Sequence, residues 1–270
     1  MLNSAGTQAR GFSLVIVVTA VALFGLLTMA AFHLMLDQRR RVSLTADHAL
    51  AKHSAEFALA EAECELSVAT DTPATPGCAT IPPQDRIAAL DPVSLRGFVA
   101  GACGSGIALG LCQPLPGQSI LALAGLLDET TFGVPIEAPP ITPDSERVPA
   151  LDARYVIEPI PDRWSGQPAQ ADEMPQPRLF RITAAGFGAD PAVNVILQTV
   201  FRPRVSNRSA SQVTIEAEPP VIRPNGLITQ TVRTTLWRID GDPQHAAETQ
   251  IQTRKLGRLS WRELIVEGTP

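Results

Sequence analysis

The most prominent pattern in the chain is an uncharged apolar run that covers residues 12–36. An α-helix rises about 1.5 Å per residue and crosses a bilayer with roughly 20 apolar residues, so this run is long enough to span a membrane. A removable secretion signal has an apolar core of about 7–15 residues and a small-residue cleavage site. Here the run is longer, and the charged stretch DQRRR (37–41) follows it. The pattern therefore predicts a retained transmembrane helix.

An amphipathic pattern follows the apolar run without a break. Residues 37–68 contain no Pro or Gly and are rich in Ala and Leu, which favour helices. Apolar or weakly polar residues recur at the spacing of one helical face, namely Val42, Ala46, Ala49, Leu50, His53, Phe57, Ala60 and Cys64. The apolar run and the amphipathic pattern together predict one helix of about 57 residues, roughly 85 Å long. The alternative is a single membrane anchor joined to an ordinary helix beside the membrane.

The second half of the chain has the period-2 alternation of half-buried strands. Phe180, Ile182 and Ala184 alternate with polar residues, turn residues occupy 186–191, and an answering strand extends to Phe201. Further candidate strands, separated by Pro- and Gly-containing turns, are 212–218, 230–239 and 259–266. Strands with short connections after a long helix predict an α+β fold, with an antiparallel sheet packed on the helix.

The start of the apolar run resembles a known leader. A short polar segment ends in RGFSLV (10–15), and the apolar run then continues into an Ala-rich helix. This arrangement resembles the class III signal of type IV pilins, in which a prepilin peptidase cuts after the Gly and methylates the new N-terminal Phe. The resemblance implies cleavage between Gly11 and Phe12, N-methylation of Phe12, and retention of the helix.

Three further stretches are similar to the PilX family of minor pilins. They are AEFALAEAECEL (55–66), ARYVIEPI (153–160) and RLFRITAAGFGADPAVNVILQTVFRP (178–203). The resemblance covers the first 70 residues and residues 150–203. The chain after residue 203 is longer than the family leads us to expect, and it either extends the sheet or forms a separate interaction hairpin.

These patterns divide the chain into five expected segments. Most of the 24 prolines lie between Pro73 and Pro177, and because Pro breaks helices and central strands, that part of the head should consist mainly of loops. The segments are the prepilin leader (1–11), the transmembrane half (12–36) and amphipathic half (37–70) of the helix, the Pro-rich, loop-rich part of the head (71–152), and the β-sheet part of the head (153–270).

The charges around the apolar run conflict with the pilin resemblance. Arg10 alone precedes the run, whereas Arg39, Arg40 and Arg41 follow it, and the positive-inside tendency would place these three in the cytoplasm. The resemblance implies the opposite orientation: one pass through the inner membrane, with the head in the periplasm before assembly and at the cell surface in the pilus afterwards. The net charge of −5 gives no support to nucleic-acid binding.

Four cysteines allow three disulfide pairings. We expect the local pairs Cys64–Cys78 and Cys103–Cys112, which close short loops. The competing hypothesis is a zinc site, but the spacings contain no C-x2-4-C pair of the kind that zinc sites use. Free thiols are a third alternative if the head is cytoplasmic.

No pattern of catalytic chemistry stands out. The four histidines do not form H-E-x-x-H, and G-x-S-x-G is absent, so we expect no enzyme activity, no catalytic or metal residues and no cofactor. Asp240 and Asp242 in IDGDP could begin a calcium loop, yet Ile251 stands where the closing Glu should be, which favours a turn. We expect Trp164, Trp237 and Trp261 to lie in the core.

The resemblance implies a minor pilin that primes or caps a type IV pilus. Most pilins carry Glu at the fifth mature residue, which here is Ile16, and a subunit without this Glu suits the tip. The basic residues Arg39, Arg40 and Arg41 should pair with the acidic residues Glu56, Glu61, Glu63 and Glu65 of staggered neighbours. Expected partners are other minor pilins, the major pilin, the prepilin peptidase, the inner-membrane assembly platform and a large tip adhesin. The alternatives are a minor pseudopilin of type II secretion and an anchored surface protein unrelated to pili.

Overall fold

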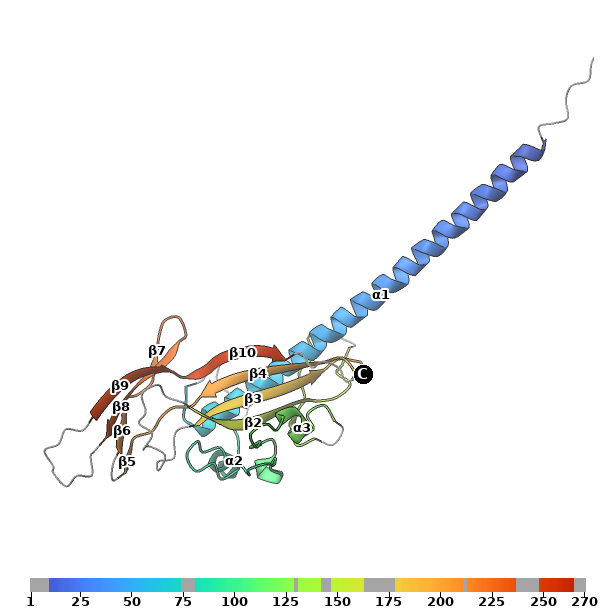
Figure 1. The fold of residues 1–270 in the computed structure, drawn as a ribbon. Helices are drawn as coiled ribbons and strands as arrows, with labels where there is room; N and C mark the ends of the chain where they lie inside the picture. The colour runs from blue at the N-terminus through green and yellow to red at the C-terminus, as the bar shows by residue number, and fades with distance from the viewer. Residues whose placement is uncertain are drawn as a thin grey trace, which may run out of the picture. The chain divides into compact units, whose positions relative to one another are not determined.

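The computed structural model describes residues 10–73, 81–128, 131–141, 147–162, 178–210, 213–236 and 248–264. The chain divides into two compact units, Met1–Asp47 and His48–Pro270. The first unit contains the N-terminal part of helix α1. The second contains the rest of α1 and every other described element (Figure 1). The architecture confirms the predicted α+β class, with a long N-terminal helix and an antiparallel sheet in the head.

Helix α1 runs without a break over Arg10–Ala69, as the two consecutive patterns predict. Its N-terminal half is long and apolar enough to cross a membrane, judged by length and composition. Residues 37–69 continue the helix because they contain neither Pro nor Gly, and it ends just before Asp71, whose φ of 48° is left-handed. The predicted single helix is therefore present.

Five strands form the first sheet, in the order β1-β2-β3-β4-β10 with antiparallel pairing throughout (Figure 1). The strands are β1 (Val134–Ile136), β2 (Ala153–Pro161), β3 (Arg178–Phe187), β4 (Asn194–Arg202) and β10 (Gly257–Leu264). The predicted hairpin is β3–β4, in which Phe180 lies opposite Phe201 and Ala184 opposite Leu197.

The segment after residue 203 extends the first sheet, one of the two alternatives that the sequence left open, and the rest of it forms a second sheet and not an isolated hairpin. Strands β5 (Arg208–Ala210), β6 (Val213–Ala217), β7 (Val221–Ile222), β8 (Ile228–Leu236) and β9 (Glu248–Lys255) form a second antiparallel sheet around β8. Strand β10 then returns to the first sheet and pairs with β4 along its length. The chain therefore builds an additional sheet and also extends the first.

The C-terminal half of α1 packs on one face of the first sheet through small residues. Ala51, Ala55, Ala58 and Ala62 are fully buried, together with Leu50, Leu59 and Leu66. The predicted face of this helix is wrong in phase, since Ala49, Ala60 and Val42 are exposed. The predicted face follows from the spacing of larger side chains such as Phe57. The sheet, however, comes so close to the helix that mainly Ala fits between them.

The other face of the first sheet carries a second apolar cluster. Val156, Ala185, Phe187 and Ile196 point there and pack against helix α3 (Ile120–Ala124) and the chain that leads into and out of it. The described part of the Pro-rich segment contributes three short helices, α2 (Gln84–Ala89), the 3-10 helix η1 (Gly106–Ala108) and α3, together with the three-residue strand β1. The first sheet is thus covered on both faces over its central strands.

Trp261 does not lie in the core as expected: it is 43% exposed on β10, with the Lys52 ammonium 5.8 Å from its ring centroid. It lies opposite Thr199 on the edge strand β10, where Lys52 of α1 lies over its ring. Trp164 and Trp237 lie outside the described residues, as do Asp240 and Asp242.

Polar contacts fix the second sheet to the first. Fully buried Gln230 of β8 exchanges hydrogen bonds of 2.9 Å with both backbone groups of Val205, in the connection between the sheets. The carboxylate of Asp162, which follows β2, accepts hydrogen bonds from Arg202 of β4 at 3.2 Å and from Arg254 of β9 at 3.5 Å. One carboxylate therefore bridges the two sheets.

Candidate functional site

The largest exposed apolar surface is the N-terminal half of α1. Every large apolar side chain from Leu14 to Leu36 is exposed, with Phe24 69% and Ile16 52% accessible. A contiguous surface of this kind is stable only in lipid or against other apolar helices. It is the feature of the described chain that most plainly requires a partner or a membrane.

The two threonine hydroxyls within this surface are satisfied by the helix itself. The Thr19 hydroxyl donates to the carbonyls of Val15 and Ile16 at 3.0 Å, and the Thr28 hydroxyl donates to Phe24 and Gly25 at 2.9 Å. A hydroxyl bonded to a preceding carbonyl carries no unpaired donor into an apolar environment. The two threonines are therefore compatible with burial in lipid or in a helical bundle.

The predicted cleavage residues Gly11 and Phe12 lie in the first turn of α1, and the leader residues 1–9 lie outside the described part. Ile16, where the resemblance to pilins would place a Glu, lies on the exposed apolar surface. The helix surface at this position is therefore uncharged.

The basic residues after the apolar half remain accessible. Arg39 and Arg40 are exposed, and the Arg41 guanidinium pairs with Asp37 one turn earlier at 2.9 Å. Both partners of this pair are more than half exposed, so solvent screens it and it contributes at most about 1 kcal/mol.

The acidic residues predicted to face neighbours have different environments. Glu56 is exposed and Glu61 half-buried, whereas Glu63 makes a bidentate pair with Arg258 of β10 at 2.7 and 2.9 Å. Glu65 is buried. The prediction that Glu65 faces a neighbouring subunit is therefore wrong, because its side chain lies in the interior of the head.

Glu65 is the centre of a buried polar network. The Arg86 guanidinium donates to both of its carboxylate oxygens, at 2.5 and 3.1 Å, and the Tyr155 hydroxyl donates to Oε2 at 2.9 Å. Burial, and then the Glu65 charge, raises the pKa of Tyr155 well above its usual value, so the phenol stays protonated. The network joins α1, α2 and β2, and nothing in the local sequence around Glu65 distinguishes it from its exposed neighbours.

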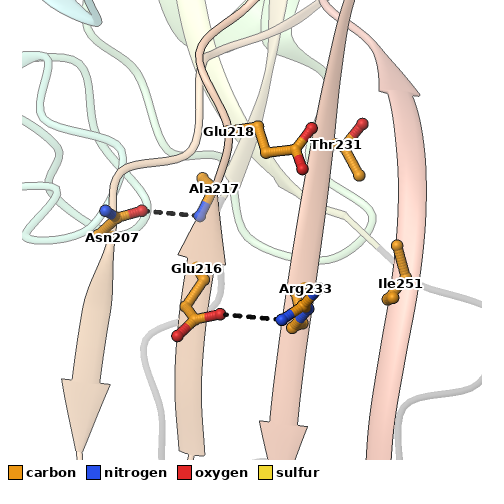
Figure 2. A pocket seen from close by; sticks show the side chains of 7 residues that line it. All are labelled: Asn207, Glu216, Ala217, Glu218, Thr231, Arg233 and Ile251. Carbon is orange, nitrogen blue, oxygen red and sulfur yellow. Dashed lines mark hydrogen bonds and ion pairs between the residues drawn. The ribbon is translucent and has the colours of Figure 1, made fainter.

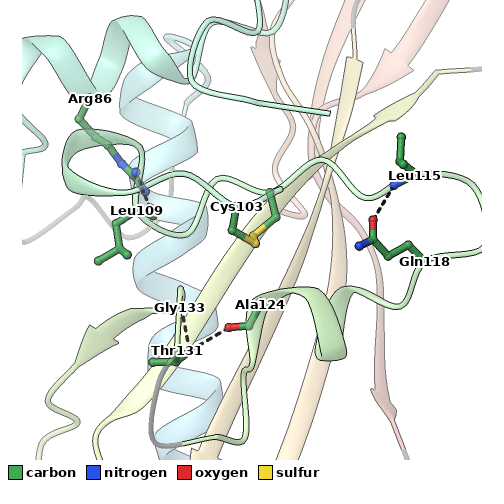
Figure 3. The surroundings of a disulfide bond; sticks show 9 residues. Arg86, Cys103, Leu109, Leu115, Gln118, Ala124, Thr131 and Gly133 are labelled. Atoms are coloured by element: carbon green, nitrogen blue, oxygen red, sulfur yellow. Dashed lines mark hydrogen bonds between the residues drawn. A yellow bond between two sulfur atoms is a disulfide. The ribbon is translucent and has the colours of Figure 1, made fainter. Parts of the chain in front are cut away.

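Arg86 extends this network to the disulfide-closed loop. Its Nη1 donates to the carbonyls of Ile107 and Leu109 at 2.8 and 2.6 Å, inside the loop that the Cys103–Cys112 disulfide closes (Figure 3). Cys112 N donates to Ile157 O at 2.9 Å, which attaches the loop to the edge of β2.

The Cys103–Cys112 disulfide is the local pair that the sequence favours. Cys64 is also disulfide-bonded, whereas its expected partner Cys78 lies outside the described residues. Within the described ranges, no group of three His, Cys, Asp or Glu side chains comes together as a metal site would require.

A shallow polar cavity of about 330 Å³ lies on the second sheet. Its lining residues are Asn207, Glu216, Ala217, Glu218, Thr231, Arg233 and Ile251 (Figure 2). Arg233 and Glu216 face each other across neighbouring strands at 3.7 Å, and Asn207 Oδ1 accepts from Ala217 N at 2.7 Å. The polar groups partly satisfy one another, so the cavity by itself indicates no particular ligand.

Comparison with known proteins identifies part of the head. The family model described as type IV pilus assembly protein PilX C-term matches residues 130–203, which run from just before β1 to the end of β4. The resemblance to PilX-like minor pilins is thereby confirmed over this region. No curated protein and no solved structure gives a significant match. Minor pilins of this family are structural components of the type IV pilus, and the apolar α1 suits a membrane-anchored member.

Proposed function

We propose that this chain is a minor pilin that primes or caps a type IV pilus, with its N-terminal helix in the helical bundle and its head near the tip. The observation that carries the proposal is the match of residues 130–203 to the PilX family in a chain whose α1 exposes a continuous apolar half. In this proposal Gly11 ends the leader, and Phe12 becomes the methylated N-terminus.

Ile16 supports a position at the tip. In most pilins the carboxylate at this place compensates the N-terminal ammonium of a neighbouring subunit, and an unpaired charge in an apolar bundle is costly. A subunit with Ile16 cannot compensate a neighbour above it, but its own ammonium can be compensated by a carboxylate below. Such a subunit fits where nothing is added above it.

Contacts between charges on adjacent helices would set the stagger. Exposed Arg39 and Arg40 are available to Glu56 and Glu61 of a neighbouring subunit, whereas Glu63 and Glu65 are occupied within the head. Each exposed pair contributes about 0–1 kcal/mol, so the pairs determine register more than affinity.

The proposed partners follow from this role. Before assembly the subunit is held in the inner membrane with its head in the periplasm, where the prepilin peptidase and the assembly platform act on it. In the fibre it contacts other minor pilins, the major pilin and a large tip adhesin. The structural role requires no enzyme activity and no cofactor.

Immunogold labelling tests the position in the fibre. Deletion of the chain should reduce the number of surface fibres and leave the shaft unchanged, and label on the complemented strain should be sparse and at fibre ends. Ile16→Glu should spread label along the shaft, whereas Val17→Glu should not, because the carboxylate then lies one residue away from the pairing position. Even, high-copy labelling of the unmodified protein along the shaft would contradict the proposal.

Processing provides a separate test. The peptidase must accommodate a residue without a side chain beside the scissile bond, so Gly11→Val should accumulate as a longer, membrane-held precursor. The unmodified protein should have a methylated Phe12 at its N-terminus by mass spectrometry. An intact Met1 in the mature protein, or normal cleavage of Gly11→Val, would rule out this site.

A further inference from the structure

Strand β9 (Glu248–Lys255) is an open edge of the second sheet. It pairs with β8 on one side, and no described strand pairs with its other side. A free edge exposes backbone donors and acceptors that can pair with another chain, and proteins normally block such edges with charges, Pro, bulges or short strands.

The other edges in the described chain carry these blocking features. Strand β1 has three residues and contains Pro135, and β5 and β7 are equally short or shorter. On β10 the edge carries Arg258, Arg262 and Glu263, with an irregularity between Arg258 and Ser260. Strand β9 differs from all of these, because residues 249–253 contain no charge, no Pro and no bulge.

The central five residues of β9 read Thr-Gln-Ile-Gln-Thr, a palindrome centred on Ile251. When two antiparallel copies of a palindromic strand pair about its centre, each side chain lies opposite one of its own kind. Ile251 would meet Ile251 of the second copy, and Thr249 would meet Thr253. Ile251 is 60% exposed in the single chain, so this pairing would cover the apolar residue that the edge leaves open.

Backbone geometry is consistent with this register. Leu256 N donates to Ile228 O at 2.9 Å, and Ile228 lies opposite Leu256 when the β8–β9 register is continued. The even-numbered residues of β9 are thus the hydrogen-bonded partners of β8, and the odd-numbered residues direct N–H and C=O to the free edge. Ile251 therefore presents both groups outward at the point where the two-fold axis would pass.

The charges at the ends of β9 favour antiparallel over parallel pairing. The strand begins with Glu248 and ends with exposed Lys255, whereas Arg254 is buried and paired with Asp162. Antiparallel pairing brings the acidic end of each copy to the basic end of the other, whereas parallel pairing in register places like charges together. The interface is then isologous, as in a two-fold dimer.

We propose that the β9 edge is a homodimer interface, in which two copies of this chain pair antiparallel about Ile251 and join their second sheets into one continuous sheet. The proposal concerns the head alone and does not depend on the role in the pilus. A membrane-held subunit that pairs in this way would keep its open edge covered.

Cross-linking of the full chain in detergent tests the geometry. The chain has no free cysteine among the described residues, so Ile251→Cys introduces a single reactive thiol there. In a hydrogen-bonded antiparallel pair the opposite Cα atoms lie about 5.5 Å apart, within the range that a disulfide spans. Ile251→Cys should therefore form a disulfide-linked dimer under mild oxidation. Val221→Cys, on the exposed strand β7 of the same sheet, should give no disulfide-linked dimer.

Mass measurement by light scattering tests the interface without a cross-link. The unmodified chain should be a dimer at micromolar concentration, and Ile251→Lys, which brings two ammonium groups together at the axis, should be a monomer. Ile251→Pro should have the same effect, because its lost N–H faces the free edge and the β8–β9 pairing is kept. Val221→Lys should stay dimeric. A monomeric unmodified chain, or a dimer that persists in both Ile251 variants, would overturn the proposal.

Discussion

Gly186 of β3 determines how closely the sheet approaches helix α1. A Cβ built on Gly186 would lie 2.1 Å from Ala51 O and 2.3 Å from Ala55 N, both of which are helix backbone atoms. Backbone cannot move aside as a flexible side chain can, so only Gly fits there. The alanines of α1 and this glycine are complementary parts of one contact, and they explain why the buried face of the helix is made mainly of small residues.

Replacing this glycine should separate the helix from the sheet. We expect Gly186→Ala to lower the free energy of unfolding of the head by about 3 kcal/mol, at the upper end of overpacking effects. Chemical denaturation of the detergent-solubilised chain measures the change. Ala60→Ser, on the exposed side of the same helix, should change stability by less than about 0.5 kcal/mol. Equal stability of the two variants would refute the close contact.

The elements of the head are joined by buried polar groups as well as by apolar packing. Glu65 on α1 accepts hydrogen bonds from Arg86 of α2 and Tyr155 of β2. Arg86 also donates a hydrogen bond to a carbonyl of the disulfide-closed loop. Breaking such a buried pair by removing one partner leaves an uncompensated charge, which costs about 3–5 kcal/mol. The Pro-rich segment is therefore fixed to the helix by specific bonds, although its helices are short.

The titration of Tyr155 reports on this network, because it is the single tyrosine of the chain. Burial and the Glu65 charge raise its pKa above the ordinary 10.0, so the native protein retains a proton that the unfolded chain loses near pH 10. The contribution of Tyr155 to the free energy of unfolding is therefore fully present below pH 10 and decreases as the pH rises above 10. Tyrosinate absorbance should appear only when the protein unfolds.

The Glu65→Gln variant is the matched comparison for this titration. It keeps the shape of the side chain and removes the charge, so the pKa of Tyr155 should fall relative to the unmodified protein while burial still keeps it above 10.0. Tyrosinate formation near pH 10 in the folded, unmodified chain would show that Tyr155 is not in this network.

A few polar contacts hold the two sheets of the head together. Asp162 accepts from Arg202 of the first sheet and from Arg254 of the second. Burial lowers the pKa of Arg254 to about 10, against the opposing effect of Asp162, so the guanidinium remains charged at neutral pH. The joint therefore depends on a carboxylate that balances two mostly buried cations.

Removal of this carboxylate charge should loosen the joint. We expect Asp162→Asn to destabilise the head by about 3 kcal/mol, since it removes the carboxylate charge that Arg202 and Arg254 share. Hydrogen exchange should increase most in β8 and β9, while the β3–β4 hairpin stays protected. Glu216→Gln, in an exposed pair on the second sheet, is the control and should have little effect. Uniform exchange across both sheets in Asp162→Asn would indicate that the carboxylate does not act as a joint.

The elements that depend on a local pattern can be predicted from the amino-acid sequence. The uncharged run over 12–36 and the absence of Pro and Gly from 37–68 predict one helix over α1, and the alternation from Phe180 to Phe201 predicts the β3–β4 hairpin. These predictions succeed because a helix and a hairpin are made by residues close in sequence, whose hydrophobic period is set by the backbone geometry. The pilin resemblance likewise rests on contiguous motifs.

Contacts between distant parts of the chain determine which helical face is buried, where Glu65 points and how the last strands are distributed between the two sheets. The buried face follows from Gly186, more than a hundred residues away, and Glu65 is internal because Arg86 and Tyr155 meet it there. Strand β10 has the same alternating pattern whether it joins the first sheet or the second, so its pairing with β4 depends on the contacts of Arg258, Trp261 and Glu263 with α1. Such contacts join residues far apart in the chain, and no local period records them.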